Sequence, residues 1–402
     1  MEQQNYSWKK SVILFLISQS VTVLGSSLVQ MAIIWFVTLK TSSGFWVSAL
    51  TICSFIPQML ISFLAGAWAD RYERKRLIIL ADSIIAAATL VLALMTPHIE
   101  KDTTLLIAIL VVSTIRSLGA GVQSPAIGAM IPQIVPEEHL MRFNGINGTI
   151  QSVIQFATPA LAGTILSLGV FQNALFIDVA TAFVGIGLLI CMMIPNQKKT
   201  DNHPSTSIFL DIKEGIKYSF ADRLIGKLLL VYGGFIFLSI PSGFLSALLV
   251  TRTFGERYLY LTIVEMVGFI GMMLGGLLMG TWGGFTNRIK TLLMGVVGYA
   301  LCSIAAGLTR GFTIYAIIMF FLSFAIPLVQ SAVITLIQEK ANPSMQGRVF
   351  GLLSIAYSGF LPIGMALFGP AADLVSVQVL MIISGIILFT MTILLQLKRV
   401  FK

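Results

Sequence analysis

The sequence is poor in charged residues. Asp, Glu, Lys and Arg make up only 11% of its 402 residues, whereas hydrophobic residues make up 56%. A soluble domain carries roughly a quarter of charged residues, so the composition excludes a water-soluble globule. Apolar stretches of about 20 residues, which cross a hydrocarbon core of about 30 Å as a helix, recur along the whole chain. The predicted fold class is an all-α polytopic membrane protein.

Cysteine and histidine are also scarce, and their positions speak against a metal site. Cys53, Cys191 and Cys302 lie in separate apolar segments, which favours neither a disulfide framework nor a thiolate site. The three histidines lie in three separate polar connections, whereas zinc needs clustered ligands. We therefore expect no metal and no other cofactor. The clustered His, Ser and acidic residues of a membrane-embedded enzyme are not seen either.

The formal charge is +9, and the positions of the basic residues indicate the membrane topology. Basic residues cluster between apolar segments rather than along one face, so the pattern does not favour nucleic-acid binding. With the N-terminus in the cytoplasm, 20 of the 26 Lys and Arg lie on that side, 5 lie outside and Arg116 lies within the membrane. The positive-inside rule therefore predicts that both termini are cytoplasmic.

Twelve spans are predicted in two halves, residues 1–194 and 226–402. The linker at 195–225 is polar at first and then places apolar residues every four positions from Ile208 to Phe220, which predicts an amphipathic helix on the membrane face. The predicted spans are 12–39, 46–69, 77–96, 104–127, 144–169, 173–194, 226–250, 258–282, 290–309, 312–336, 348–370 and 376–397.

An internal repeat relates the two halves. "GAWADRYERKR" at 66–76 follows the second span, and "GTWGGFTNRIK" at 280–290 follows the eighth, at an offset of 214 residues. "VQS" occurs at both 122–124 and 329–331, a register that places Ser323 opposite Arg116. Parallel six-helix halves are one recurring plan of membrane transporters.

Several motifs resemble those of the major facilitator superfamily. The 66–76 segment resembles its loop signature between spans two and three, and "IRSLGAG" at 115–121 resembles its fourth-span arginine signature. "ATPALAG" at 157–163 resembles the fifth-span antiporter signature at Pro159 and Gly163, although Ile154, Ala157 and Thr158 depart from it. "LVQMAIIWFVTLKT" and "IQEKANPSMQGRVFGL" are similar to the macrolide-efflux branch of bacterial drug:proton antiporters.

This resemblance implies two pseudo-symmetric six-helix bundles in a bacterial cytoplasmic (inner) membrane. The expected function is export of amphipathic compounds, macrolides first, by proton antiport with alternating access. The expected partners are the small-molecule substrate, protons and the lipid bilayer, with no nucleic acid, and the chain is expected to act as a monomer. Export of a siderophore, lipid or peptide, or a sensor or scaffold without transport, are the alternatives.

Ionisable residues inside spans are costly, so each is a functional candidate. Arg116, Glu265 and Asp178 are predicted to couple protons to transport, with Glu265 favoured over Asp178 as the partner of Arg116. A fixed ion pair, a hydrogen-bond anchor and compensation of a helix N-terminus are the structural alternatives. Asp82 is expected to pair with loop arginines.

Two further sets complete the candidate site. The resemblance implies a conformational latch formed by Gly66, Asp70, Arg71, Arg74 and Arg76, although these residues would also serve as a stop-transfer cluster. A polar stripe on the first span, within about 80° at 100° per residue, predicts a substrate cavity, with interhelical hydrogen bonding as the alternative. The cavity residues are Gln19, Thr22, Ser26 and Gln30 from this stripe, with Gln123, Gln155, Gln330 and Tyr357.

Overall fold

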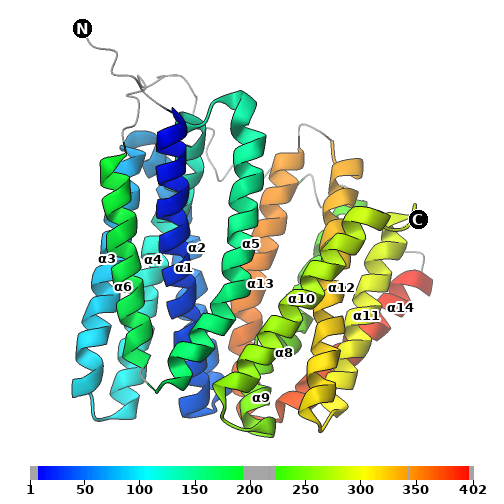
Figure 1. Ribbon diagram of the computed structural model, residues 1–402. Helices are drawn as coiled ribbons and strands as arrows, with labels where there is room; N and C mark the ends of the chain where they lie inside the picture. The colour runs from blue at the N-terminus through cyan, green and yellow to red at the C-terminus, as the bar shows by residue number, and fades with distance from the viewer. Residues whose placement is uncertain (1–7, 170, 193–216, 218–222, 343–344, 398–402) are drawn as a thin grey trace. The chain divides into compact units, whose positions relative to one another are not determined.

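The computed structural model describes residues 8–169, 171–192, 217, 223–342 and 345–397, and in these residues the regular structure is helical (Figure 1). Twelve of their segments are long and apolar enough to cross a membrane, which confirms the predicted fold class. The helices are α1 (Trp8–Thr41), α2 (Gly44–Arg71), α3 (Arg74–Met95), η1 (Thr96–His98), α4 (Asp102–Ile134), α5 (Glu137–Ser167), α6 (Phe171–Cys191), α8 (Arg223–Gly243), α9 (Ser246–Phe254), α10 (Tyr258–Trp282), α11 (Arg288–Leu308), α12 (Phe312–Lys340), α13 (Gln346–Leu374) and α14 (Val377–Leu397).

The contacts divide the chain into two units. The first comprises Met1–Lys40 and Ala49–Asp201, and the second comprises Thr41–Ser48 and Asn202–Lys402. The connection between α1 and α2 thus groups with the second unit although both helices continue into the first. The amphipathic helix predicted in the linker lies outside the described residues, apart from residue 217.

The seventh span is interrupted, whereas the sequence predicted one continuous helix over 226–250. Residues 244 and 245 form a turn between α8 and α9, where the N–H groups of Phe244 and Leu245 both donate to the carbonyl of Ile240. Pro241 lies inside the last turn of α8. Because proline lacks the N–H group and its ring crowds the preceding turn, it favours a break at this place.

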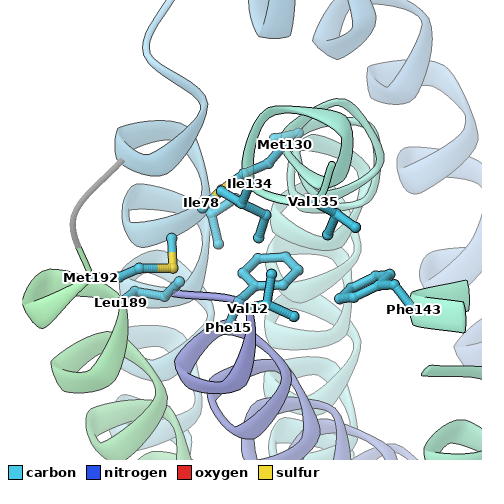
Figure 2. Close-up of a cluster of buried hydrophobic side chains, with 10 residues drawn as sticks. Val12, Phe15, Ile78, Met130, Ile134, Val135, Phe143, Leu189 and Met192 are labelled. Carbon is cyan, nitrogen blue, oxygen red and sulfur yellow. The ribbon is translucent and has the colours of Figure 1, made fainter. Parts of the chain in front are cut away.

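In the first unit, α3 packs against both α4 and α6, and Figure 1 shows α3 and α6 side by side. One end of this unit, where α1 begins and α6 ends, is filled by apolar side chains that point toward one another (Figure 2). Lipid tails are as apolar as these side chains, so close packing rather than removal from water holds the helices. The cluster comprises Val12, Phe15, Ile78, Ala126, Met130, Ile134, Val135, Phe143, Leu189 and Met192.

Two glycines allow the helices of this unit to approach closely. A Cβ atom at Gly119 of α4 would overlap the side chain of Ile85 on α3. A Cβ atom at Gly25 of α1 would overlap the hydroxyl of Thr181 on α6. Small residues at such contacts bring helix backbones together. As a result, side chains of α3, α4 and α6 meet in the interior of the unit.

In the second unit, α12 packs against α10 and α11, while α14 packs against α11 and α8. The helix α8 also packs against α13, and these two helices together with α12 surround the cavity described below.

Candidate functional site

A buried ion pair lies in the interior of the first unit. Arg116 of α4 donates through Nη1 to Oδ2 of Asp178 on α6, and it also contacts Oγ1 of Thr89 on α3. The side chains of Arg116 and Asp178 are only 7% and 2% exposed. The Thr89 hydroxyl donates to the same carboxylate oxygen at 3.0 Å. Three helices thus converge on one charge pair whose oxygens are hydrogen-bonded, as buried charges require.

The partner of Arg116 is therefore Asp178, and the sequence-based preference for Glu265 is wrong. The physical reason lies in the packing, because α3 contacts α4 and α6 together and Thr89 bridges the two charges. Glu265 lies on α10 of the second unit and is partly exposed. Within the described chain it forms no ion pair, whereas the guanidinium of Arg116 is paired with Asp178.

A second polar pair links α3 to α4. Asp82 is 1% exposed, and its Oδ1 accepts a hydrogen bond from Nε2 of Gln123. Its Oδ2 is buried and has no hydrogen-bond partner among the described residues. The expected pairing of Asp82 with loop arginines is wrong, because this side chain is buried in the α3–α4 interface, where its hydrogen-bond partner is Gln123.

The two polar pairs are stacked along the α3–α4 interface. Asp82 and Thr89 lie seven residues apart on α3, and Gln123 and Arg116 lie seven residues apart on α4 in the opposite direction. Seven residues are two helical turns, or about 10.5 Å along the axis. The antiparallel helices α3 and α4 therefore carry two polar contacts in register. We call the residues of these two contacts and Asp178 the α3–α4 polar network.

The predicted polar stripe on α1 lies within the first unit. Ser26 donates to Oδ1 of Asp178 at 3.3 Å, and Gln30 donates to the hydroxyl of Ser54 on α2 at 3.1 Å. Gln19 and Thr22 are buried, and within the part of the chain that the structure describes their side-chain polar atoms have no hydrogen-bond partner. Ser26 and Gln30 thus form hydrogen bonds between helices, the alternative to lining a cavity.

A cavity of about 480 Å³ lies within the second unit between α8, α12 and α13. Two residues predicted for the substrate cavity, Gln330 and Tyr357, line it. Aromatic rings, aliphatic groups, hydroxyls and one amide share its wall without a charged group, a mixture suited to an uncharged part of an amphipathic ligand. The lining residues are Tyr232, Gln330, Val333, Ile334, Leu353, Ser354, Tyr357 and Ser358.

Sequence reasoning missed Tyr232, Ser354 and Ser358 in this cavity. A signal was available for α13, because Leu353 and Ser354 precede Tyr357 by four and three residues and therefore share its helix face. Of the other candidates, Gln155 is exposed on α5, while Pro159 and Gly163 are buried in the same helix.

The segment predicted as a latch lies where α2 ends and α3 begins. Arg74 ties the end of α2 to α4 through the carbonyls of Ala69 and Ala129. Arg76 pairs with Glu73 at 2.6 Å and is 83% exposed. Arg71 is exposed and Gly66 is partly buried. The side chain of Asp70 lies outside the described part of the structure.

A carboxylate that the sequence did not single out forms several polar contacts in the second unit. Asp373, near the end of α13, pairs with Arg252 of α9 at 2.6 Å and accepts from the N–H groups of Gly44 and Phe45 at 2.7 and 2.9 Å. The Ser43 hydroxyl donates to it at 2.8 Å. Asp373 thus caps the first turn of α2, where a negative charge is favourable. We call these residues, 43–45, Arg252 and Asp373, the Asp373 joint.

No local sequence pattern predicts this joint, because Asp373 and Gly44 are 329 residues apart in the chain. Arg252 adds a further tie, since its Nε donates to the carbonyl of Ser42 at 2.9 Å. The joint explains why the connection between α1 and α2 groups with the second unit.

Comparison with known proteins identifies the family. The model of the Major Facilitator Superfamily matches residues 15–365. The chain belongs to this superfamily. Its sequence is 29% identical over 395 residues to macrolide efflux protein A of Streptococcus pyogenes, covering 98% of this chain and 96% of that protein. The corresponding protein of Enterococcus faecalis is 28% identical over 321 residues, covering 79% and 98%.

The fold of this facilitator agrees with solved structures. A bacterial homologue of the human lysosomal transporter Spinster matches it with a TM-score of 0.70 and 15% identity, covering 96% of each chain. At this identity the likeness shows the fold alone. The chain is thus a multi-pass membrane protein of the superfamily with full-length similarity to macrolide efflux proteins.

Proposed function

We propose that this facilitator is a secondary active transporter that exports amphipathic compounds, macrolides first, by proton antiport. The observation that carries the proposal is the buried Arg116–Asp178 pair within the α3–α4 polar network. Charges inside a membrane are costly and are retained chiefly where they serve transport. The full-length similarity to macrolide efflux protein A supports the choice of substrate class.

Coupling requires that the charge pair exist in two arrangements. In the described arrangement, Arg116 neutralises Asp178. A change in the proton occupancy of the network alters which groups must remain paired, so it biases the equilibrium between conformations. One charge that moves down the membrane potential supplies roughly 2.3 kcal/mol per 100 mV, enough to drive modest accumulation. Glu265 stays a candidate for a second coupling or substrate contact.

The cavity of the second unit is proposed as part of the substrate site. The rings of Tyr232 and Tyr357 offer apolar faces, and Gln330, Ser354 and Ser358 offer hydrogen-bonding groups. Such a wall suits a large ligand that carries both apolar and hydroxyl-rich faces. Gln19, Thr22, Ser26, Gln30, Gln123 and Gln155 remain proposed contributors from the first unit.

The proposed topology places both termini in the cytoplasm of a bacterial cell and the chain in its cytoplasmic membrane. The Asp373 joint then lies at the outer surface, and the 66–76 segment lies at the cytoplasmic surface. We propose that contacts at these two ends form and break in turn during alternating access. The functional unit is proposed to be a monomer without a cofactor or catalytic activity.

A transport assay tests this function. Vesicles that contain the purified protein and an acidic lumen are expected to accumulate a labelled macrolide, because protons leave as the drug enters. Accumulation that persists after the pH gradient and potential are collapsed would contradict antiport. Gradient-driven uptake of a siderophore, lipid or peptide in place of the macrolide would favour the alternative exporters, and no uptake of any compound would favour a sensor or scaffold.

A further inference from the structure

Asp82 is the second buried carboxylate in the α3–α4 polar network. The first, Asp178, is already paired with Arg116. Asp82 lies eight residues after the first residue of α3, about 12 Å along the helix axis. The residue is 1% exposed. Its position is therefore well inside the apolar span, where an isolated charge is costly.

The charged groups around Asp82 leave it without a counter-ion. The only charged residue of α6 is Asp178, and α4 carries Arg116 and Asp102. Arg116 is paired with Asp178, while Asp102 pairs with Lys40 at 2.8 Å. Asp178 lies two helical turns from Asp82 along α3, because Thr89, seven residues after Asp82, donates to the Asp178 carboxylate.

The basic residues of α3 itself are also engaged elsewhere. The ammonium group of Lys75, seven residues before Asp82, donates to the carbonyls of Ile190 and Met192 at 3.0 and 2.7 Å. Arg76 pairs with Glu73 at 2.6 Å, and Arg74 donates to carbonyl groups of α2 and α4. The described interior of α3, α4 and α6 therefore holds two carboxylates and one arginine.

This charge count has a chemical consequence. A buried carboxylate without a cation takes up a proton rather than remain charged in an apolar surrounding. Among the described residues, Gln123 donates to Oδ1 of Asp82 and no group donates to Oδ2, so a single neutral donor is all that stabilises a charge on this carboxylate. A protonated carboxyl group supplies one O–H donor and keeps its acceptor capacity.

We propose that Asp82 is the proton-binding residue of this facilitator and that the Arg116–Asp178 pair controls its release. The inference rests on the proposed function of proton antiport and names the proton site within it. When the pair separates, the charge of Arg116 becomes available to stabilise the Asp82 carboxylate two turns away. The O–H bond of Asp82 then breaks, the proton passes to water on the cytoplasmic side, and Asp82 becomes a carboxylate.

The first test reads the proton directly and does not depend on transport. Infrared spectra of the purified wild-type protein and of Asp82→Asn are compared at neutral pH. The wild-type spectrum is expected to show a carbonyl band of a protonated carboxylic acid that is lost in Asp82→Asn. The matched control is Glu100→Gln, which removes an exposed carboxyl group and is expected to leave that band unchanged. A band that Asp82→Asn leaves intact would overturn the proposal.

The second test reads coupling in vesicles. Asp82→Asn keeps a side chain that accepts from Gln123 but cannot release a proton. We expect it to exchange macrolide for macrolide like the wild type, while macrolide addition no longer releases lumenal protons. Asp82→Glu is expected to restore release. Wild-type proton release that survives in Asp82→Asn would overturn the assignment of the site, whereas a wild type that transports macrolide without proton release would overturn the proposed antiport itself.

Discussion

Burial of the charges of Arg116 and Asp178 costs desolvation free energy, and the pair has a specific geometry. Each side chain is nearly inaccessible to solvent. The two charges compensate one another, and the Thr89 hydroxyl donates a hydrogen bond to the carboxylate. A buried pair of this kind contributes little net stability, but the loss of one partner leaves an uncompensated charge. Stability and transport can therefore be separated at this pair by comparing single and double substitutions.

We expect Asp178→Ala to lower the free energy of unfolding by roughly 3–5 kcal/mol, because Arg116 is left buried without its counter-ion. The double variant Arg116→Met with Asp178→Leu is expected to recover most of this stability and yet not to transport against a gradient. Thermal unfolding in detergent and uptake in vesicles measure the two properties. A double variant that is stable and pumps normally would show that the pair serves the fold alone.

The cavity of the second unit offers a prediction about affinity. Tyr357→Ala removes a ring from the cavity wall and is expected to raise KM for the macrolide roughly tenfold, the factor that about 1.4 kcal/mol of lost binding free energy produces. Little change in kcat is expected, because the ring contacts the bound substrate throughout. Phe321→Ala, at an α12 side chain that is 54% exposed and outside the cavity wall, is the control. Equal effects of both substitutions would contradict the placement of the substrate.

At the scale of the helix, the spacing between α3 and α4 decides whether the two polar contacts can form. Gly119 permits this approach because a Cβ atom there would overlap Ile85. Gly119→Val is therefore expected to cost about 1–3 kcal/mol of stability through overpacking and to weaken proton coupling. Gly128→Val is the matched control on α4, since its Cβ would meet no atom. Thermal unfolding and proton release are the measurements, and equal results for the two variants would count against the packing argument.

The Asp373 joint acts at the junction of three helix ends. Loss of a helix cap costs about 1 kcal/mol, which corresponds to a roughly fivefold larger population of the opened joint. In a background without the three native cysteines, Asp373→Ala is therefore expected to raise the reaction rate of Ser42→Cys with an impermeant thiol reagent about fivefold. Glu256→Ala, an exposed carboxylate after α9, serves as the control. Unchanged reactivity would exclude the joint as a restraint on this connection.

At the scale of the whole molecule, hydropathy predicted the twelve spans and the family motifs predicted the superfamily, because both depend on local composition. Arg116 and Asp178 stood out for the same reason, as charges inside apolar runs. Their pairing depends on how α3 contacts α4 and α6, which no local pattern encodes. The Asp373 joint and the cavity contribution of Tyr232 likewise arise from helices far apart in sequence.

The central claim, that drug export and proton movement are one process, is tested most directly by adding a macrolide to vesicles without a preset gradient and recording lumenal pH. We predict that macrolide entry makes the lumen more alkaline with the wild-type protein, because each entry is exchanged for protons. A folded Arg116→Ala variant is predicted to give no change. Macrolide entry through the wild-type protein with constant lumenal pH would contradict the claim.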